Sequence, residues 1–115
     1  MGLDMYLDRS DGEEIYWRKA NQIEGWFARR GLAQNGQYVS VSYEELKQLL
    51  FACERVSEDH ELASEILPRT SGFFFGSQEY DEWYFKDIEF TIEELTRLLN
   101  DPDASKYKYT YYESW

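Results

Sequence analysis

The sequence predicts an α+β fold in a single domain, with three or four helices packed on a small antiparallel sheet. Residues 3–7 and 106–112 alternate apolar and polar side chains with the period of two that is typical of a strand. Several other segments repeat apolar residues at spacings of three and four, which is the helical period. The length of 115 residues fits one domain, 1–115, and no long linker divides it.

The first third of the chain is expected to contain a strand, a turn and a helix. Residues 3–7 predict a half-buried strand, and residues 10–12 predict the turn after it. Residues 13–30 are expected to form a helix, because their apolar side chains recur at spacings of four, three and four. These side chains belong to Tyr16, Ala20, Ile23 and Phe27. Gly31 follows two arginines, as a glycine that ends a helix does.

The middle of the chain is expected to contain a short strand and two helices. Residues 38–41 favour the strand, and Ser42 with Glu45 forms the pattern of a capping box that starts a helix. One face of that helix carries Leu46, Leu49, Leu50, Cys53 and Val56. Residues 57–67 are interpreted as a further short helix that Pro68 ends.

The last third predicts the longest helix and a final strand. Residues 72–76 place three phenylalanines between two glycines, which indicates a buried loop or a short strand. Residues 81–100 predict a helix that ends before Pro102. Its core stripe is expected to be Phe85, Ile88, Ile92, Leu95 and Leu99. Residues 106–112 predict a strand with one aromatic face.

The charge balance limits the classes of function. Twelve basic residues stand against 23 acidic ones, a net charge of -11. This excludes a broad basic surface for DNA or RNA and attachment to anionic membranes. Residues 44–94 hold fourteen acidic and four basic residues, so most of the excess lies there. With no apolar run long enough to span a bilayer, no signal-peptide pattern and one cysteine, a cytoplasmic location in the host cell is expected.

The residues that could carry catalysis or hold a metal are few. On one helix, Cys53 and His60 would lie about 10 Å apart along the axis, so only an intervening loop could pair them. The chain has no Cys-x-x-Cys or His-x-x-x-His pattern, which argues against a closed zinc site. Residues 58–61 could bind Mg²⁺ or Ca²⁺ weakly or form an ordinary solvated face. We therefore expect a non-enzymatic protein without a cofactor.

Four uncommon segments span the chain: MGLDMYL at 1–7, YWRKANQI at 16–23, SGFFFGS at 71–77 and EYDEWYF at 79–85. In these segments the chain resembles a small uncharacterised protein family of phage and prophage genomes, along its whole length. The resemblance implies a mobile-element origin but no catalytic residue. Small acidic phage proteins of other families often inhibit host nucleases or defence systems, which suggests an anti-defence role by analogy.

The outer face of the predicted helix 81–100 is the candidate surface for a protein partner. It carries Glu82, Trp83, Asp87, Glu89, Phe90, Glu93 and Glu94. Carboxylates three or four residues apart lie about 5–6 Å from one another, and such a row can imitate a nucleic-acid strand. The sequence therefore predicts an inhibitor or modulator of a host protein with a basic, nucleic-acid-binding surface, such as a nuclease or a CRISPR-type complex. The acidic residues can also serve solubility alone, and the aromatic side chains can be covered within the fold or form a homodimer.

The alternative function is binding of a small molecule or nucleotide. Trp17, Phe73, Phe74 and Phe75 are the candidate ligand residues, since aromatic side chains beside glycines can stack on a ring. They can equally fill the core. Arg18 and Lys19 could contact an anion or pair with the surplus carboxylates.

Overall fold

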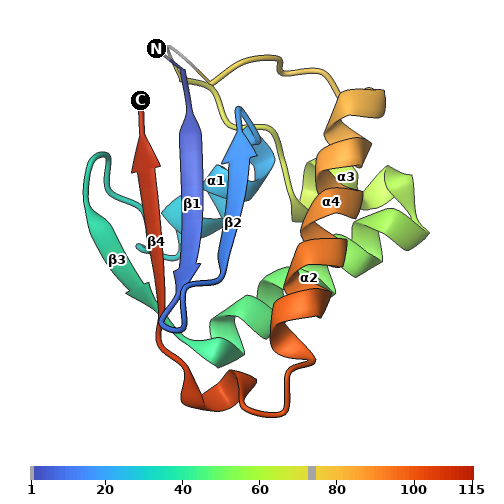
Figure 1. The fold of residues 1–115 in the computed structure, drawn as a ribbon. Helices are drawn as coiled ribbons and strands as arrows, with labels where there is room; N and C mark the ends of the chain where they lie inside the picture. The colour runs from blue at the N-terminus through green and yellow to red at the C-terminus, as the bar shows by residue number, and fades with distance from the viewer. Residues whose placement is uncertain (1, 73–74) are drawn as a thin grey trace.

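The structure is a computed structural model that describes residues 2–72 and 75–115. The described chain forms a four-stranded antiparallel sheet in the order β2-β1-β4-β3, which confirms the predicted α+β class (Figure 1). The strands are β1 (Asp4–Arg9), β2 (Glu14–Arg18), β3 (Tyr38–Val41) and β4 (Tyr109–Ser114). The first and last strands of the chain are therefore neighbours at the centre of the sheet.

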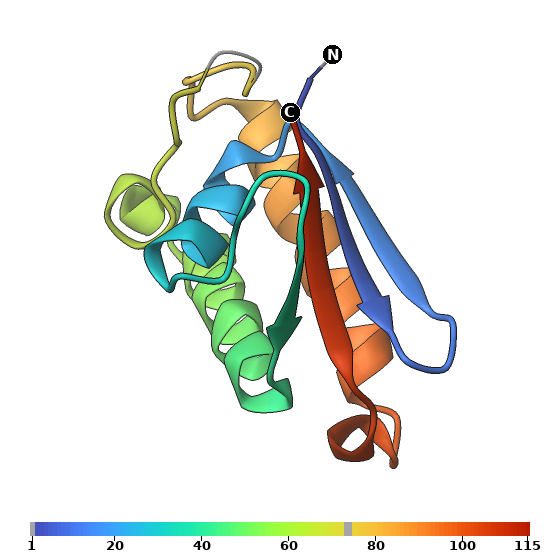
Figure 2. The same ribbon diagram turned by 90° about the vertical axis from the view of Figure 1, so that its left-hand side faces the viewer.

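Four α-helices lie on one side of this sheet and beside its β2 edge. They are α1 (Asn21–Arg29), α2 (Tyr43–Glu58), α3 (Ala63–Ile66) and α4 (Glu82–Leu99), with short 3₁₀ turns at His60–Leu62 and Ala104–Lys106. Figure 2 shows α1 and α2 against one face of the sheet, and the described residues place no helix on the other face. No helix in the described ranges is long and apolar enough to cross a membrane.

The predicted helix over residues 13–30 is wrong in its first half. Residues 14–18 form β2, which pairs with β1 so that Leu7 faces Ile15 and Met5 faces Trp17. The side chains of Ile15 and Trp17 point into the core and their neighbours point outward. Branched and aromatic residues in succession favour a strand, and the turn after β1 returns the chain for pairing. The helical spacing of Tyr16 and Ala20 was coincidental.

The helix ends agree with the capping signals in the sequence. The amide of Glu45 donates to the Ser42 hydroxyl (3.0 Å), and the amide of Ser42 donates to the Glu45 carboxylate (2.9 Å), which completes the capping box of α2. Asp81 caps α4 by accepting from the amides of residues 83 and 84. Gly31 follows α1 with a φ of +72°, a conformation that favours glycine.

The buried stripe of α4 is rotated relative to the predicted one. Phe85 and Ile92 are only half-buried. The fully buried side chains on α4 are Tyr84, Ile88, Thr91, Leu95, Leu98 and Leu99. The final strand also differs, since β4 begins at Tyr109 and the inward aromatic side chains are Tyr109 and Tyr111. The ring of Tyr111 stacks on that of Phe27 (centroids 3.8 Å apart), which joins the sheet to α1.

Candidate binding surfaces

The outer surface of α4 carries two exposed aromatic side chains, as the sequence placed them. Trp83 is 62% exposed and Phe90 is 39% exposed. No described residue covers this side of the helix enough to bury either ring. Three of the predicted carboxylates are also exposed: Glu82, Glu89 and Glu93.

Two other predicted acidic residues of α4 do not point freely into solvent. Glu94 is half-buried and pairs with Arg97, at 3.1 Å. Asp87 is half-buried as well, and burial raises the pKa of its carboxyl to about 6, although the charge of Arg69 acts in the opposite direction. Both residues turn inward because the buried stripe of α4 is rotated.

The charges around the two exposed rings are mixed. Lys86 lies between Trp83 and Phe90 in the sequence, and its Nζ stands 4.4 Å from the centre of the Trp83 ring. Arg18 and Lys19 line a cleft beside α4, together with Trp83, Lys86 and Phe90. Near Trp83, α4 therefore does not present the continuous row of carboxylates that an imitation of a phosphate backbone requires.

Two of the residues predicted for the alternative ligand site, Trp17 and Phe75, are buried. Trp17 is 2% exposed, and its indole Nε1 donates to the Thr91 hydroxyl (2.9 Å), so it is a core residue that joins β2 to α4. Phe75 is also buried in the core, edge-on to Trp115. Phe73 and Phe74 lie outside the described residues. Strand alternation and core packing use both rings, so ligand contact by Trp17 and Phe75 stays a prediction that their burial does not favour.

Cys53 and His60 have different surroundings. Cys53 is fully buried on α2, and burial raises the pKa of its thiol well above the usual range. His60 is exposed and stacks on the ring of Phe85, with centroids 3.7 Å apart. Within residues 2–72 and 75–115, no group of three His, Cys, Asp or Glu side chains is arranged to hold a metal ion.

The outer face of the sheet carries a surface that the sequence did not predict. Each strand contributes one tyrosine at the same level, in the spatial order Tyr16, Tyr6, Tyr112, Tyr38. We call this set the tyrosine row. Neighbouring ring centroids are 5.1, 6.1 and 4.6 Å apart along it. The two edge residues are the most exposed, Tyr38 at 68% and Tyr16 at 43%. The row crosses all four strands on the face that no described helix covers.

Carboxylates flank the tyrosine row on the same face. Alternation along β1 and β2 places Asp4, Asp8 and Glu14 outward with the tyrosines. The Tyr16 hydroxyl donates to the Asp4 carboxylate. Asp8 lies directly opposite Glu14, and a hydrogen bond with Asp8 is the main cause that raises the pKa of the Glu14 carboxyl. Arg18 is the one described basic residue on the outward side of these two strands.

The tyrosine row could be found from the sequence only in part. The inward positions of β1 imply that Tyr6 points outward, and alternation in a correctly placed β4 implies the same for Tyr112. Bringing all four rings to one level requires the strand order and the register, which the sequence pattern does not contain.

In comparisons with known proteins, no family model, no curated protein and no solved structure matches the chain.

Proposed function

We propose that the chain is a non-enzymatic binding protein whose open sheet face docks a basic segment of a partner protein. The tyrosine row, flanked by carboxylates, is the observation that supports this proposal. Tyrosine provides a large, rigid contact area with little loss of side-chain entropy on binding. Its ring also attracts the Lys and Arg cations that a basic partner presents.

The charges of this face favour a cationic partner. Asp8 and Glu14 face each other across β1 and β2, and like charges in that position destabilise a sheet. A Lys or Arg side chain of the partner would relieve this repulsion. Single-stranded nucleic acid could stack on the tyrosines, but its phosphates would meet these carboxylates and a net charge of -11.

The partner class that fits best is a host protein whose basic surface normally binds nucleic acid, such as a nuclease or a defence complex. An acidic protein is drawn to such a surface over a distance, which raises the association rate and makes binding sensitive to salt. The phage-type resemblance agrees with an inhibitory role but does not identify the partner.

A charge exchange on the sheet tests the proposal with a nona-arginine peptide as the probe. Asp8→Lys with Glu14→Lys is expected to weaken binding at least about tenfold, or ~1.4 kcal/mol, because it replaces two of the three carboxylates beside the tyrosine row with cations. The matched control is Glu58→Lys with Glu61→Lys. It changes the net charge by the same amount, at two exposed positions that do not belong to the sheet. Fluorescence anisotropy at low and high salt measures both. Equal losses in the two double variants would show that only net charge matters.

A single exposed ring can also be removed with a close control. Tyr38→Ser is expected to weaken peptide binding several-fold without unfolding the protein, because Tyr38 is 68% exposed on an edge strand. Phe51 is 62% exposed on α2, away from the sheet face, so Phe51→Ser is expected to leave binding unchanged. If Phe51→Ser weakens binding as much as Tyr38→Ser, the tyrosine row is not the docking surface.

The outer surface of α4 is the second candidate, supported by the exposure of Trp83 and Phe90. Trp83→Ala with Phe90→Ala is expected to leave the melting temperature nearly unchanged, since exposed side chains contribute only about 0.5 kcal/mol each to stability. Thermal unfolding checks this. A double variant that loses partner binding, while the Asp8 and Glu14 exchange retains it, would place the partner on α4, with Glu82, Glu89 and Glu93 as the charged rim.

A further inference from the structure

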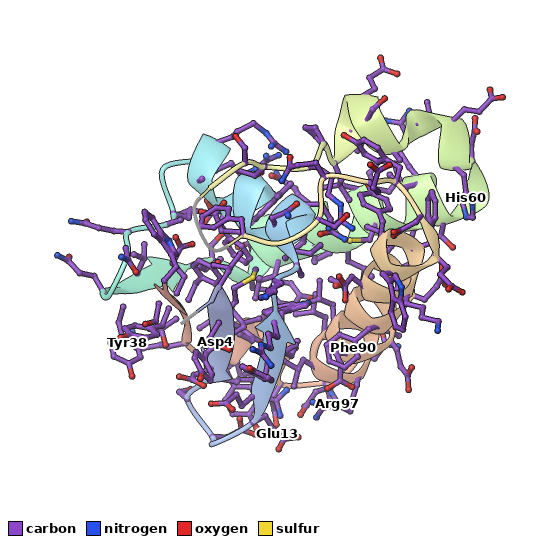
Figure 3. All side chains as sticks on the ribbon, turned by 90° about the horizontal axis from the view of Figure 1, so that it is seen from above. Asp4, Glu13, Tyr38, His60, Phe90 and Arg97 are labelled. Carbon is purple, nitrogen blue, oxygen red and sulfur yellow. The ribbon has the colours of Figure 1, made fainter. Side chains whose placement is uncertain are left out.

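We propose that a cleft beside α4 binds a small ligand that carries a phosphate group and a planar ring, the chemistry of a nucleotide. The cleft has a volume of about 550 Å³ and is lined by the end of β2, by Arg69 and residues 76–77, and by α4. Its lining includes Arg18, Lys19, Arg69, Lys86, Trp83 and Phe90. Figure 3 shows Phe90 and Tyr38 on widely separated parts of the molecule, so the cleft lies away from the Tyr38 end of the tyrosine row, although Arg18 belongs to its lining and lies two residues after Tyr16 on β2.

The cleft concentrates positive charge in an acidic protein. Four of the chain's 12 Lys and Arg residues line it, whereas Asp87 is the one acidic residue among the described lining. Arg18, Lys19 and Lys86 form no ion pair with any described residue. Cations that stay unpaired together provide the charge that a phosphate requires.

Arg69 is held rigidly at the back of this cleft. Its side chain is only 5% exposed. The Nε donates to the carbonyl of Glu79 (2.8 Å), and Nη1 donates to the side-chain oxygen of Gln22 (3.1 Å). The guanidinium also lies 5.2 Å from the centre of the Tyr84 ring. Arg69 forms a long ion pair with Asp81 (3.9 Å), and its charge also acts on the carboxyl of Asp87, so a phosphate would share this cation with two carboxyl groups.

Lys19 is placed by an unusual backbone. Its φ of +57° lies in the left-handed region and is the one such value among the described residues that are not glycine. A conformation of this kind costs on the order of 1 kcal/mol and is often found at functional sites. Its aliphatic stem packs over Gly76, where a Cβ would come within 3.3 Å of it. Gly76 has a φ of +86°, so both its conformation and its lack of a side chain position Lys19 at the cleft.

The two aromatic side chains supply a wall for a ring. Trp83 is 62% exposed, and Lys86 Nζ lies 4.4 Å from the centre of its ring. Since Lys86 covers one face of the Trp83 ring, a base would stack on the other face, and Lys86 and Lys19 would supply cations for its phosphates within the same cleft. Stacking on an aromatic ring contributes about 1–3 kcal/mol per base, and a cleft of this volume is typical of small-molecule sites.

Isothermal titration calorimetry with ADP, inorganic phosphate and adenosine tests the proposal. ADP is expected to bind at least about tenfold more tightly than either fragment, because only ADP uses the cations and the ring together. Lys86→Glu is expected to remove ADP binding. The matched control is Lys47→Glu, since Lys47 also lies over an aromatic ring, that of Tyr43, on the exposed side of α2. Circular dichroism confirms that both variants fold.

Two results would overturn the proposal. One is the absence of ADP binding at ~1 mM ligand. The other is an equal loss in Lys86→Glu and Lys47→Glu, which would show attraction by net charge alone. The proposal is independent of partner docking, because the Asp8 and Glu14 exchange is expected to leave the affinity for ADP within about twofold.

Discussion

Glu24→Gln is expected to stabilise the protein strongly at alkaline pH and much less at acidic pH. Relative to the unchanged chain, its free energy of unfolding should gain up to about 4 kcal/mol between pH ~5 and pH ~8.5. The reason is a pair of buried carboxyl groups that join α1 to β4. Glu24 is 4% exposed and Glu113 is 2% exposed.

The surroundings of the pair favour a proton on Glu24. The Tyr111 hydroxyl (2.9 Å) and the Trp115 indole (2.6 Å) both donate to the carboxylate of Glu113, while Glu24 Oε1 has no hydrogen-bond partner in the described part of the chain. Burial raises the pKa of Glu24 to about 8. The charge of Glu113 and a hydrogen bond with it act in the same direction, and Arg29 opposes them.

The sign of the pH effect follows from this raised pKa. An unfolded glutamate loses its proton near its ordinary pKa of 4.5, whereas Glu24 in the folded protein keeps it until about pH 8. Between these values the folded state binds more protons than the unfolded state, so stability falls as the pH rises. Glutamine preserves the neutral shape and removes this titration. Asp87, with a pKa of about 6, acts in the same direction over a lower range and is present in both proteins.

Urea unfolding followed by tryptophan fluorescence, across this pH range, measures the effect. Glu65→Gln is the control, since Glu65 is exposed and the same substitution there is expected to change stability by no more than about 0.5 kcal/mol. A constant difference between Glu24→Gln and the unchanged chain at every pH would contradict a raised pKa at Glu24.

Trp17→Ala is expected to lower the free energy of unfolding by about 3–5 kcal/mol, the range found when a large buried aromatic side chain is truncated. Trp17 is 2% exposed, and its bond to the Thr91 hydroxyl ties β2 to α4. Trp83→Ala removes the same side chain from an exposed position and is expected to cost only about 0.5 kcal/mol.

Chemical denaturation of both tryptophan variants gives the comparison. Equal losses would show that burial does not distinguish the two rings. A Trp17→Ala protein with unchanged stability would contradict a core role for Trp17 and would favour the prediction that it contacts a ligand.

The elements with local signals were predicted well. α2 and α4 each have a polar cap at the residue before the helix, Ser42 and Asp81, and a long periodic apolar stripe. Of the β1–β2 hairpin, only β1 was predicted, because the pattern of residues 14–18 fits both a strand and a helix. Only pairing with β1 decides between them. The charges of Asp87 and Glu94 were misplaced for a related reason, since the rotation of α4 depends on what packs against it.

The binding surfaces depend on tertiary structure even more. The tyrosine row needs the order of four strands, two of which lie at opposite ends of the chain. The cationic cleft joins Lys19, Arg69 and Lys86, which lie far apart in the sequence, and the helix predicted over 13–30 would have placed Lys19 on the wrong element. Exposure of Trp83 and Phe90, by contrast, could be anticipated from helical periodicity alone.

Backbone NMR spectra of the protein titrated with the nona-arginine peptide test most directly whether the open sheet face is the docking surface. We expect the largest amide shifts at the tyrosine row and at Asp8 and Glu14, and we expect them to diminish as salt rises. The largest shifts along Glu82, Glu89 and Glu93 of α4, or shifts spread evenly over every acidic segment, would contradict docking at the sheet.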